Sequence, residues 1–578
     1  MEEKILLIDD SGRQVPRTHQ TAGLLCAVTL LLSACSAAGD DAEAPQPEDP
    51  IHTDLVSPSS YNAQPRDAIA DGGEFATALD FWPRQFNPFH KAASAHAADV
   101  WNWYGPQLAL TDWKGQWHYN AEFLDNVEAE VKDGKTVVTY TIDRNAKFVD
   151  NTDLDWEAFA ATWHANSGAD PNFESALTNV YSRIESVQPG ASHNQAVVTF
   201  TNTVENWQRY FPTVLHPAVD TAEEFNSGFV NNLPREWGSG PFALVTIDAE
   251  AGAIVFQRSD NWWSEPAKLE KRRFIQVDAA DALTAFRGGK INALDVSIRE
   301  RMTSARGMEG VDILEGVAPT RRLFLLDANS RPLRDPSVRR AIFAATNRKQ
   351  ILTSRYEGIP AAQEPPNSLM YFPWQTGYQD NLSATVDFDP EQAKTLLDDA
   401  GWKPGTDGIR RKAGQRLEIS IPATDRTDSA RAAQKLLQQQ LHEIGVALEL
   451  VERPGQDALA LFGTEQDGRA FNGALVVQEA RFADGVANLD DVTGPGGLLE
   501  RTGIDNAALR QHVAGLCTEF DSGKQLARGR QAEHALFSQL TILPMSILPG
   551  EVAVKRGLTN YGPAAFAQLP VQDVGWEL

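Results

Sequence analysis

The chain has 578 residues, which is enough for two or more domains, each with a hydrophobic core of its own. Its formal net charge of -26 at pH 7 argues against binding to nucleic acid or to anionic lipid, because both require a basic surface. Only three cysteines occur, so a scaffold held together by disulfides is excluded as well.

The N-terminal segment has the pattern of a secretion signal. Residues 24–32 form an apolar run that is too short to cross a bilayer but suits the hydrophobic region of a signal peptide. The run ends in LSAC at residues 32–35, which resembles the bacterial lipobox, so we expect Cys35 to carry a lipid as the first mature residue. Glu2 and Glu3 stand where a signal peptide is usually basic, which indicates that translation begins later, near Val15.

After Cys35 the composition and the hydrophobic pattern of the chain change twice. Residues 35–71 are rich in Ala, Asp, Glu and Pro, which predicts a disordered acidic tether. From residue 72 an alternating pattern predicts a strand, and a loop rich in rings and prolines follows at 82–90. An aromatic run at residues 100–104 either fills a core or forms the wall of a ligand site. The candidate ligand-binding residues of this region are Phe86, Asn87, Trp101, Trp103 and Tyr104.

Residues 136–296 alternate between short strands and turns. Strands are expected at 136–142 and 196–200, with a turn at 146–152 and a helix from Asp155 between them. Asn151 stands at a turn position for which asparagine, like glycine, tolerates a left-handed backbone. The sequence GSGPF at residues 238–242 is not a phosphate loop, because the required lysine does not follow.

The stretch 321–352 predicts a buried strand followed by a helix. The apolar residues 323–326 form the strand, and Asp335-Pro336 starts the helix, since Asp caps free amides and Pro lacks an N–H that the first turn does not need. One apolar helix face is expected to continue as far as Ile351. Further strands and helices alternate through residues 389–451, which predicts a partly parallel sheet with helices on its faces.

Several of these stretches resemble blocks of the family 5 extracellular solute-binding proteins, the peptide-binding receptors of ABC importers. The blocks are 321–352, GSGPF at 238–242, RSDNWW at 258–263, DALTAFRGGKINALDV at 281–296 and LLDDAGW at 396–402. They stand in the family's order between residues 72 and 561. The resemblance implies an α/β fold of the two-lobed periplasmic-binding-protein type, the large peptide-binding variety, with mixed sheets flanked by helices and a small extra subdomain in lobe I.

The resemblance also implies a domain organisation and a function. The expected segments are a signal peptide at 1–34, the tether at 35–71, lobe I at 72–322 with a subdomain at about 116–235, lobe II at 323–547, and a return to lobe I at 548–578. The expected protein is a monomer without cofactors, lipid-anchored at the extracytoplasmic face of the cell membrane. It would capture peptides between its lobes and deliver them to the membrane subunits of an ABC permease.

The family's acidic ligand residue is the least certain of these correspondences. In family members a Gly-Trp-x-x-Asp segment supplies the acid that pairs with a peptide's α-ammonium, but residues 471–489 lack the Gly-Trp. Aligned without gaps, the acid falls near Arg481; with a short insertion it falls on Asp484. An acid there grips an N-terminus, whereas Arg481 favours a carboxylate. The candidates in this region are Glu479, Arg481, Phe482 and Asp484.

Motifs for catalysis are weak. His442-Glu443 resembles half of a zinc-protease helix, but Val446 stands in place of the second histidine, and neither a serine-nucleophile elbow nor a phosphate loop is present. An enzyme is therefore not expected. The alternatives are the same fold binding an oligosaccharide or a metal chelate, and a surface sensor that has lost transport.

Overall fold

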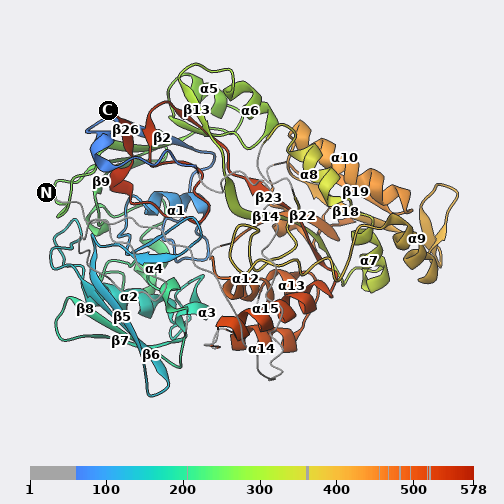
Figure 1. The fold of residues 1–578 in the computed structure, drawn as a ribbon, viewed down its shortest axis with the longest axis horizontal. Helices are drawn as coiled ribbons and strands as arrows, with labels where there is room; N and C mark the ends of the chain where they lie inside the picture. The colour runs from blue at the N-terminus through green and yellow to red at the C-terminus, as the bar shows by residue number, and fades with distance from the viewer. Residues whose placement is uncertain are drawn as a thin grey trace, which may run out of the picture. The chain divides into compact units, whose positions relative to one another are not determined.

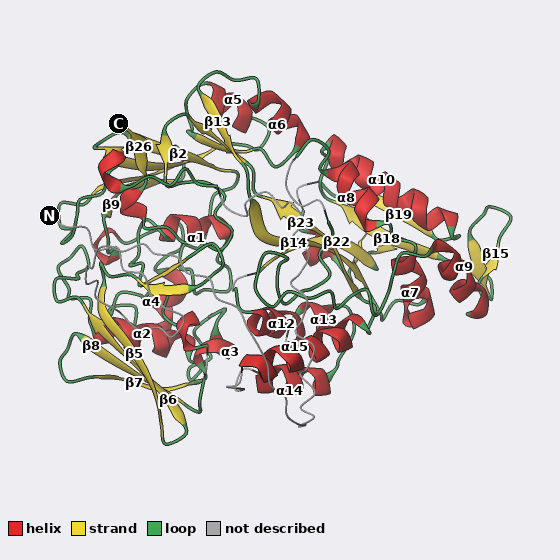
Figure 2. Ribbon diagram, in the orientation of Figure 1, coloured by secondary structure: helices red, strands yellow, loops and turns green. Residues whose placement is uncertain are grey.

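The computed structural model describes residues 60–578 except 205, 360–363, 455, 467, 481–482, 495, 517–518 and 520–521. The predictions for the signal peptide, Cys35 and the tether as far as residue 59 lie outside the described residues, as do those for Arg481 and Phe482. No helix of the described part is long and apolar enough to span a membrane. Figures 1 and 2 show that its sheets are flanked by helices.

Part of the segment expected to be a disordered tether is a paired strand. Strand β1 (Ile69–Ala70) lies within the segment expected to be a tether, yet it pairs with β26 (Gly575–Glu577), which also pairs with β25 (Leu558–Thr559). The side chain of Ile69 is 2% exposed. Pairing with the far end of the chain thus orders a segment whose composition alone favours disorder.

The first large core lies around a four-stranded sheet in the order β2-β11-β10-β9. These strands are β2 (Glu74–Leu79), β11 (Lys271–Gln276), β10 (Ala253–Arg258) and β9 (Phe242–Asp248). Strand β2 runs parallel to β11, and the other pairs are antiparallel. The same core also takes residues from α1 (Ala95–Trp101), from the hairpin of β3 (Ala109–Thr111) and β4 (Trp117–Tyr119), and from the short helices α3 (Thr178–Tyr181) and α4 (Ala222–Ser227).

A second sheet belongs to the same core and is wholly antiparallel, in the order β5-β6-β8-β7. Its strands are β5 (Leu124–Lys132), β6 (Lys135–Ile142), β8 (Gln195–Phe200) and β7 (Ile184–Pro189), and α2 (Trp156–Asn166) packs on β7 and β8. Asp155 caps α2 by accepting the N–H of Glu157 at 2.8 Å. Asn151 has φ +70°, so the left-handed turn predicted for it is confirmed.

The second large core surrounds the antiparallel sheet β22-β14-β23 and the parallel pair β18–β19. These strands are β22 (Gly473–Glu479), β14 (Val317–Leu326), β23 (Ile542–Pro549), β18 (Glu418–Ala423) and β19 (Ala447–Glu452). The helices are α7 (Pro336–Ala344), α8 (Arg348–Arg355), α9 (Pro390–Asp399), α10 (Asp428–Glu443), α11 (Ala458–Leu461), α12 (Gly485–Thr493), α13 (Leu498–Arg501), α14 (Ala507–Leu516) and α15 (Ser522–Phe537). Figure 1 shows α12 to α15 grouped together. Small hairpin strands complete it: β15 (Lys403–Pro404), β16 (Arg410–Lys412), β17 (Gln415–Arg416), β20 (Glu465–Gln466) and β21 (Arg469–Ala470).

The strand-to-helix passage is confirmed at its start and differs at its end. Residues 323–326 are fully buried in β14, and Asp335 caps α7 with Pro336 in the first turn. The expected single helix is instead two, because Asn347 caps a new helix, α8, by accepting the N–H of Gln350 at 2.9 Å. A side chain that competes for backbone amides thus divides the apolar face.

Strands β14 and β23 lie side by side where the chain passes between the two large cores. The first core takes its residues from 75–293 and 554–574, and the second from 323–545. A third, smaller core adjoins them, built from α5 (Ala282–Arg287), α6 (Arg299–Ala305) and the sheet β12 (Ala293–Asp295), β24 (Val552–Lys555) and β13 (Val311–Leu314). Within the residues that the structure describes, the two paired strands β14 and β23 therefore lead from one large core to the other.

Candidate functional site

A cleft of about 620 Å³ lies between residues of the first and second cores. This volume is within the range of about 300–1,000 Å³ that is usual for small-molecule sites. One wall comes from the β3–β4 hairpin and the segment 206–212, the other from the end of β22 and the start of α12, and residues 565–568 close a side. Among the described residues, those with a charge that line the cleft are Asp99, Arg209, Glu479 and Asp484, so acids outnumber bases in this part of the lining.

Asp484 joins the two walls. It caps α12, since one of its carboxylate oxygens accepts the N–H groups of Val486 and Ala487 at 2.8 and 3.3 Å. Its other oxygen accepts a hydrogen bond from the side-chain amide of Asn206, at 2.5 Å, across the cleft. A carboxylate at a helix N-terminus is stabilised by the helix dipole, and here it is also held by a donor from the opposite wall.

The walls touch at a glycine. Gly115, in the turn between β3 and β4, has φ +82°, and a Cβ added to it would lie 1.9 Å from the Cβ of Ala483. Only glycine therefore permits this turn to reach the second core. Nearby, Arg183 and Asp490 form an ion pair at 3.8 Å between the same two parts of the chain. The two walls of the cleft are thus in direct contact.

Two of the four candidate residues predicted between 479 and 484 line the cleft. Glu479 and Asp484 both line the cleft, Glu479 at the end of β22 and Asp484 at the start of α12. Because Asp484 lies after the strand has ended, its side chain is directed by the helix cap rather than by strand alternation. Arg481 and Phe482 are outside the described residues, so which charge occupies the family's acidic position stays a prediction.

The predicted aromatic region is placed mainly in the first core. Phe86 and Asn87 are 0% exposed, Trp101 is 5% and Tyr104 is 1%, and none of them is among the residues that line the cleft. Their polar atoms bond within the core: Trp101 donates to Thr213 Oγ1 at 2.9 Å, and Tyr104 to the carbonyl of Pro234 at 2.7 Å. Trp103 differs, because it lines an adjoining pocket of about 270 Å³.

Several cleft residues were not anticipated from the sequence. Gln208 and Arg209 lie in the short 3₁₀ helix Trp207–Arg209, which Asn206 precedes, and Trp117 lies near them on β4. The ring of Trp117 packs against that of Trp207 at 5.2 Å between centroids. The available signal was a run of polar residues beside tryptophan, but no periodicity marks it as a wall of a site.

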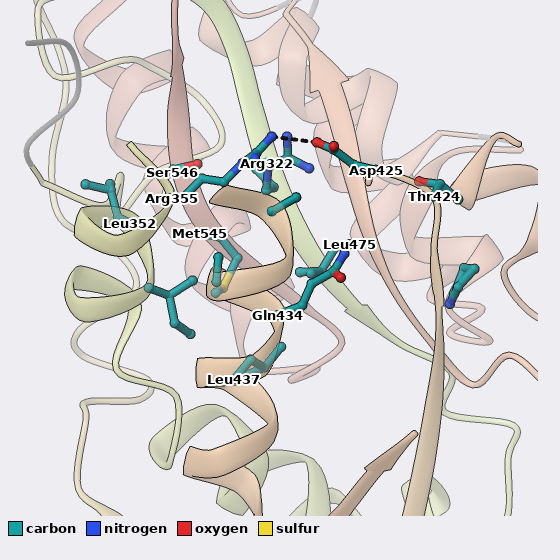
Figure 3. Close-up of a pocket in the computed structure, with 14 residues that line it drawn as sticks. Arg322, Leu352, Arg355, Thr424, Asp425, Gln434, Leu437, Leu475, Met545 and Ser546 are labelled. Carbon is teal, nitrogen blue, oxygen red and sulfur yellow. Dashed lines mark hydrogen bonds and ion pairs between the residues drawn. The ribbon is translucent and has the colours of Figure 1, made fainter. Parts of the chain in front are cut away.

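A separate cavity of about 50 Å³ in the second core is lined in part by residues of α8 and α10, among them Leu352, Arg355, Gln434 and Leu437 (Figure 3). Arg355, which is 7% exposed, donates to Asp425 at 2.6 Å and to Thr427 and Ser429. Burial alone would raise the pKa of Asp425, but Arg355, the bonds from Thr427 and nearby Arg322 together hold that pKa below its ordinary value. The cavity has room for a few water molecules at most, so we assign it to stability.

The described residues contain no group of three or more His, Cys, Asp or Glu side chains that could hold a metal ion.

The family model described as bacterial extracellular solute-binding proteins, family 5 Middle, matches residues 104–497. The chain is 30% identical over 566 residues to the oligopeptide-binding protein OppA of Mycobacterium tuberculosis, covering 95% of this chain and 92% of that protein.

Solved structures share the fold, and two of them serve as examples. The periplasmic EDTA-binding protein EppA gives a TM-score of 0.81 at 18% identity, covering 91% of this chain and 99% of that one. The oligopeptide-binding protein AppA from Bacillus subtilis, in complex with a nonapeptide, gives 0.73 at 16% identity, covering 88% and 100%. The expected α/β fold of the two-lobed solute-binding type is therefore confirmed. With its sequence matched along most of its length, this chain belongs to family 5 of the bacterial extracellular solute-binding proteins.

Proposed function

We propose that the protein is the peptide receptor of an ABC importer. The observation that carries this proposal is the 30% identity to OppA along 95% of the chain, which extends through the segments that line the cleft. The family and fold are those of binding proteins rather than enzymes, and we propose no turnover of the ligand. The captured peptide passes to the membrane subunits of a permease.

The cleft has a chemistry that suits a peptide. Trp117, Pro319 and Phe566 supply apolar surface, and Asn206 and Gln208 supply amide groups that can bond to a peptide backbone. Glu479 and Asp484 place two acids near one end, where they attract a free α-ammonium group. We propose that the N-terminus of the ligand lies there and that Arg481 and Phe482 act beside it.

The closing motion follows from the connection between the cores. We propose that lobe I comprises residues 72–322 and 548–578 and lobe II residues 323–547, with the small subdomain at about 116–235. The paired strands β14 and β23 then form the hinge, since they lead from one core to the other. A ligand that touches both walls stabilises the closed state by its differential affinity for that state.

The anchor is part of the same proposal. A receptor that serves a membrane permease gains from confinement to the membrane surface, and the sequence LSAC at residues 32–35 supplies a lipid site at Cys35. A diacyl chain attached there holds the protein far more firmly than one acyl chain does. We propose that the mature protein acts as a lipid-anchored monomer at the extracytoplasmic face of the membrane.

Ligands carried through purification test the proposed function. The full-length protein is purified in detergent, denatured in acid to release what it holds, and the released molecules are identified by mass spectrometry. Peptides at near-equimolar amounts support the proposal. Recovery of an oligosaccharide or a metal chelate instead, with no peptide, assigns the protein to a different solute and overturns it.

A further inference from the structure

Arg272 is a buried cation enclosed by rings. It lies on β11, and its side chain is 2% exposed. Its guanidinium carbon lies 3.7 Å from the ring centroid of Phe274, 4.4 Å from that of Phe75 and 4.9 Å from that of Trp103. The stacking fixes the plane of the guanidinium, so its N–H groups have a defined direction before any ligand arrives.

The charge of Arg272 has no anionic partner within the described part of the chain. Its N–H groups donate to neutral acceptors only: Thr77 Oγ1 at 2.6 Å and the backbone carbonyls of Phe75 and Arg273. Its Nε is buried without a hydrogen-bond partner. Burial lowers the pKa of Arg272 to about 9, although Tyr561 and Asp99 act in the opposite direction.

The next residue along the strand, Arg273, has the anionic partner that Arg272 lacks among the described residues. Arg273 points to the opposite face of β11 and forms an ion pair with Glu74 at 2.7 Å, with both side chains partly exposed. Two arginines in succession on one strand thus differ in what compensates their charge. An uncompensated buried cation is costly, and the cost is relieved when an anion with matching geometry comes into contact with it.

A pocket lies against Arg272. The pocket of about 270 Å³ is lined by Arg272 together with Trp103, Asn102, Gln107 and Tyr561. It shares Asp99, Ala567 and Gln568 with the ligand cleft, so the two spaces adjoin. The side chain of Asp99 is 64% exposed, so water screens its charge from an anion deeper in the pocket.

We propose that this pocket is a carboxylate subsite of the cleft, in which Arg272 pairs with a carboxylate of the bound solute. The planar fork of a guanidinium matches a carboxylate, and such pairs are among the stronger hydrogen bonds in proteins. This inference rests on the proposed function, because it takes the bound solute to be a peptide. The carboxylate is then the C-terminus or an acidic side chain.

Calorimetry with three peptides separates the two sources. The peptides are tetra-alanine, its C-terminal amide, and Ala-Ala-Glu-Ala amide, titrated into full-length protein freed of bound ligand. The variants are R272M, which keeps an apolar side chain among the rings, and R273M as the matched control. We expect the parent to bind at least one of the two carboxylate-bearing peptides ten-fold or more tightly than the neutral amide. R272M loses this preference and R273M keeps it.

Stability distinguishes a ligand-binding role from a structural one. If Arg272 serves mainly to hold the rings together, R272M unfolds at a clearly lower temperature than R273M does. We expect it to be as stable as the parent without ligand, because an apolar side chain replaces an uncompensated charge. Equal affinity of the parent for all three peptides, or an unchanged preference in R272M, overturns the proposal.

A further experiment tests the carboxylate subsite independently of the proposed peptide ligand. If the parent binds none of the peptides, the thermal unfolding of parent and R272M is compared in acetate and in chloride at equal ionic strength. A higher unfolding temperature in acetate for the parent alone supports the carboxylate subsite even when the peptide assignment fails. Equal shifts in both proteins overturn it.

Discussion

The side-chain amide of Asn206 donates a hydrogen bond to the carboxylate of Asp484 at 2.5 Å, although the two residues lie on opposite walls of the cleft. Asp484 is at the same time the cap of α12, through the N–H groups of Val486 and Ala487. One carboxylate therefore serves both the local stability of a helix and the contact between the lobes. Substitutions on the two sides of the bond separate these roles.

Replacing Asp484 has the larger effect on stability. D484A removes the helix cap, which costs about 1 kcal/mol, and also the bond to Asn206. N206A removes only the bond across the cleft and leaves the cap intact. Urea unfolding is expected to show a lower free energy of unfolding for D484A than for N206A. Equal losses in the two variants would show that the cap contributes nothing.

Gly115 tests whether contact between the walls matters for binding. G115A costs about 1 kcal/mol for a left-handed alanine and also places a Cβ against Ala483. G134A is the matched control, because Gly134 has φ +76° with nothing within 4 Å of an added Cβ. We expect G115A to lose at least as much stability as G134A, but only G115A to lose ligand affinity. Unchanged affinity in G115A contradicts a closed state held by this contact.

The pair of Arg355 and Asp425 predicts a pH dependence of stability. The pKa of Asp425 is lowered in the folded protein, so its contribution is fully present well above the ordinary value of 3.8 and is lost as pH falls through the folded pKa. D425N weakens the pair and leaves Arg355 buried beside a neutral group, at a cost of about 1–2 kcal/mol.

Urea unfolding between pH 7 and pH 3 measures this difference. We expect a constant gap between parent and D425N from pH 7 to about 5, and a shrinking gap below about 4. The exposed pair of Arg426 and Glu452, at 3.4 Å, provides a control, because E452Q should change stability little at any pH. A difference in the free energy of unfolding between parent and D425N that grows as the pH falls would contradict a lowered pKa of Asp425.

The anchor is tested by the location of the protein. In C35A the residue that carries the lipid is absent, so we expect the protein to leave the membrane fraction or to remain unprocessed with its signal attached. Gel mobility separates the two results, because the unprocessed form is larger. A C35A protein of mature size that stays in the membrane fraction contradicts the lipid anchor.

The sequence predicts local structure where one short-range rule dominates. Leu323 to Leu326 are apolar on both faces and become a buried strand, and Asp335-Pro336 starts a helix as its chemistry requires. The prediction fails at Asn347, where a side-chain cap divides a helix that hydrophobic spacing alone would continue. Periodicity carries no information about such competition for amides.

The candidate site is less predictable, because its walls come from distant parts of the chain. Glu479 and Asp484 were expected, but Asn206 and Gly115 become site residues only when the fold brings them opposite Asp484 and Ala483. The aromatic residues are the opposite case, because the sequence marks them as candidates but the fold places them away from the cleft lining. Trp101 and Tyr104 have the composition of a ligand wall, yet their polar atoms bond inside the core.

Calorimetric titration of ligand-free, full-length protein with a mixed pool of short peptides tests the central claim most directly. The account predicts saturable binding of peptides, and no comparable heat with oligosaccharides or with metal–EDTA. Heat with one of those solutes and none with peptides contradicts the claim.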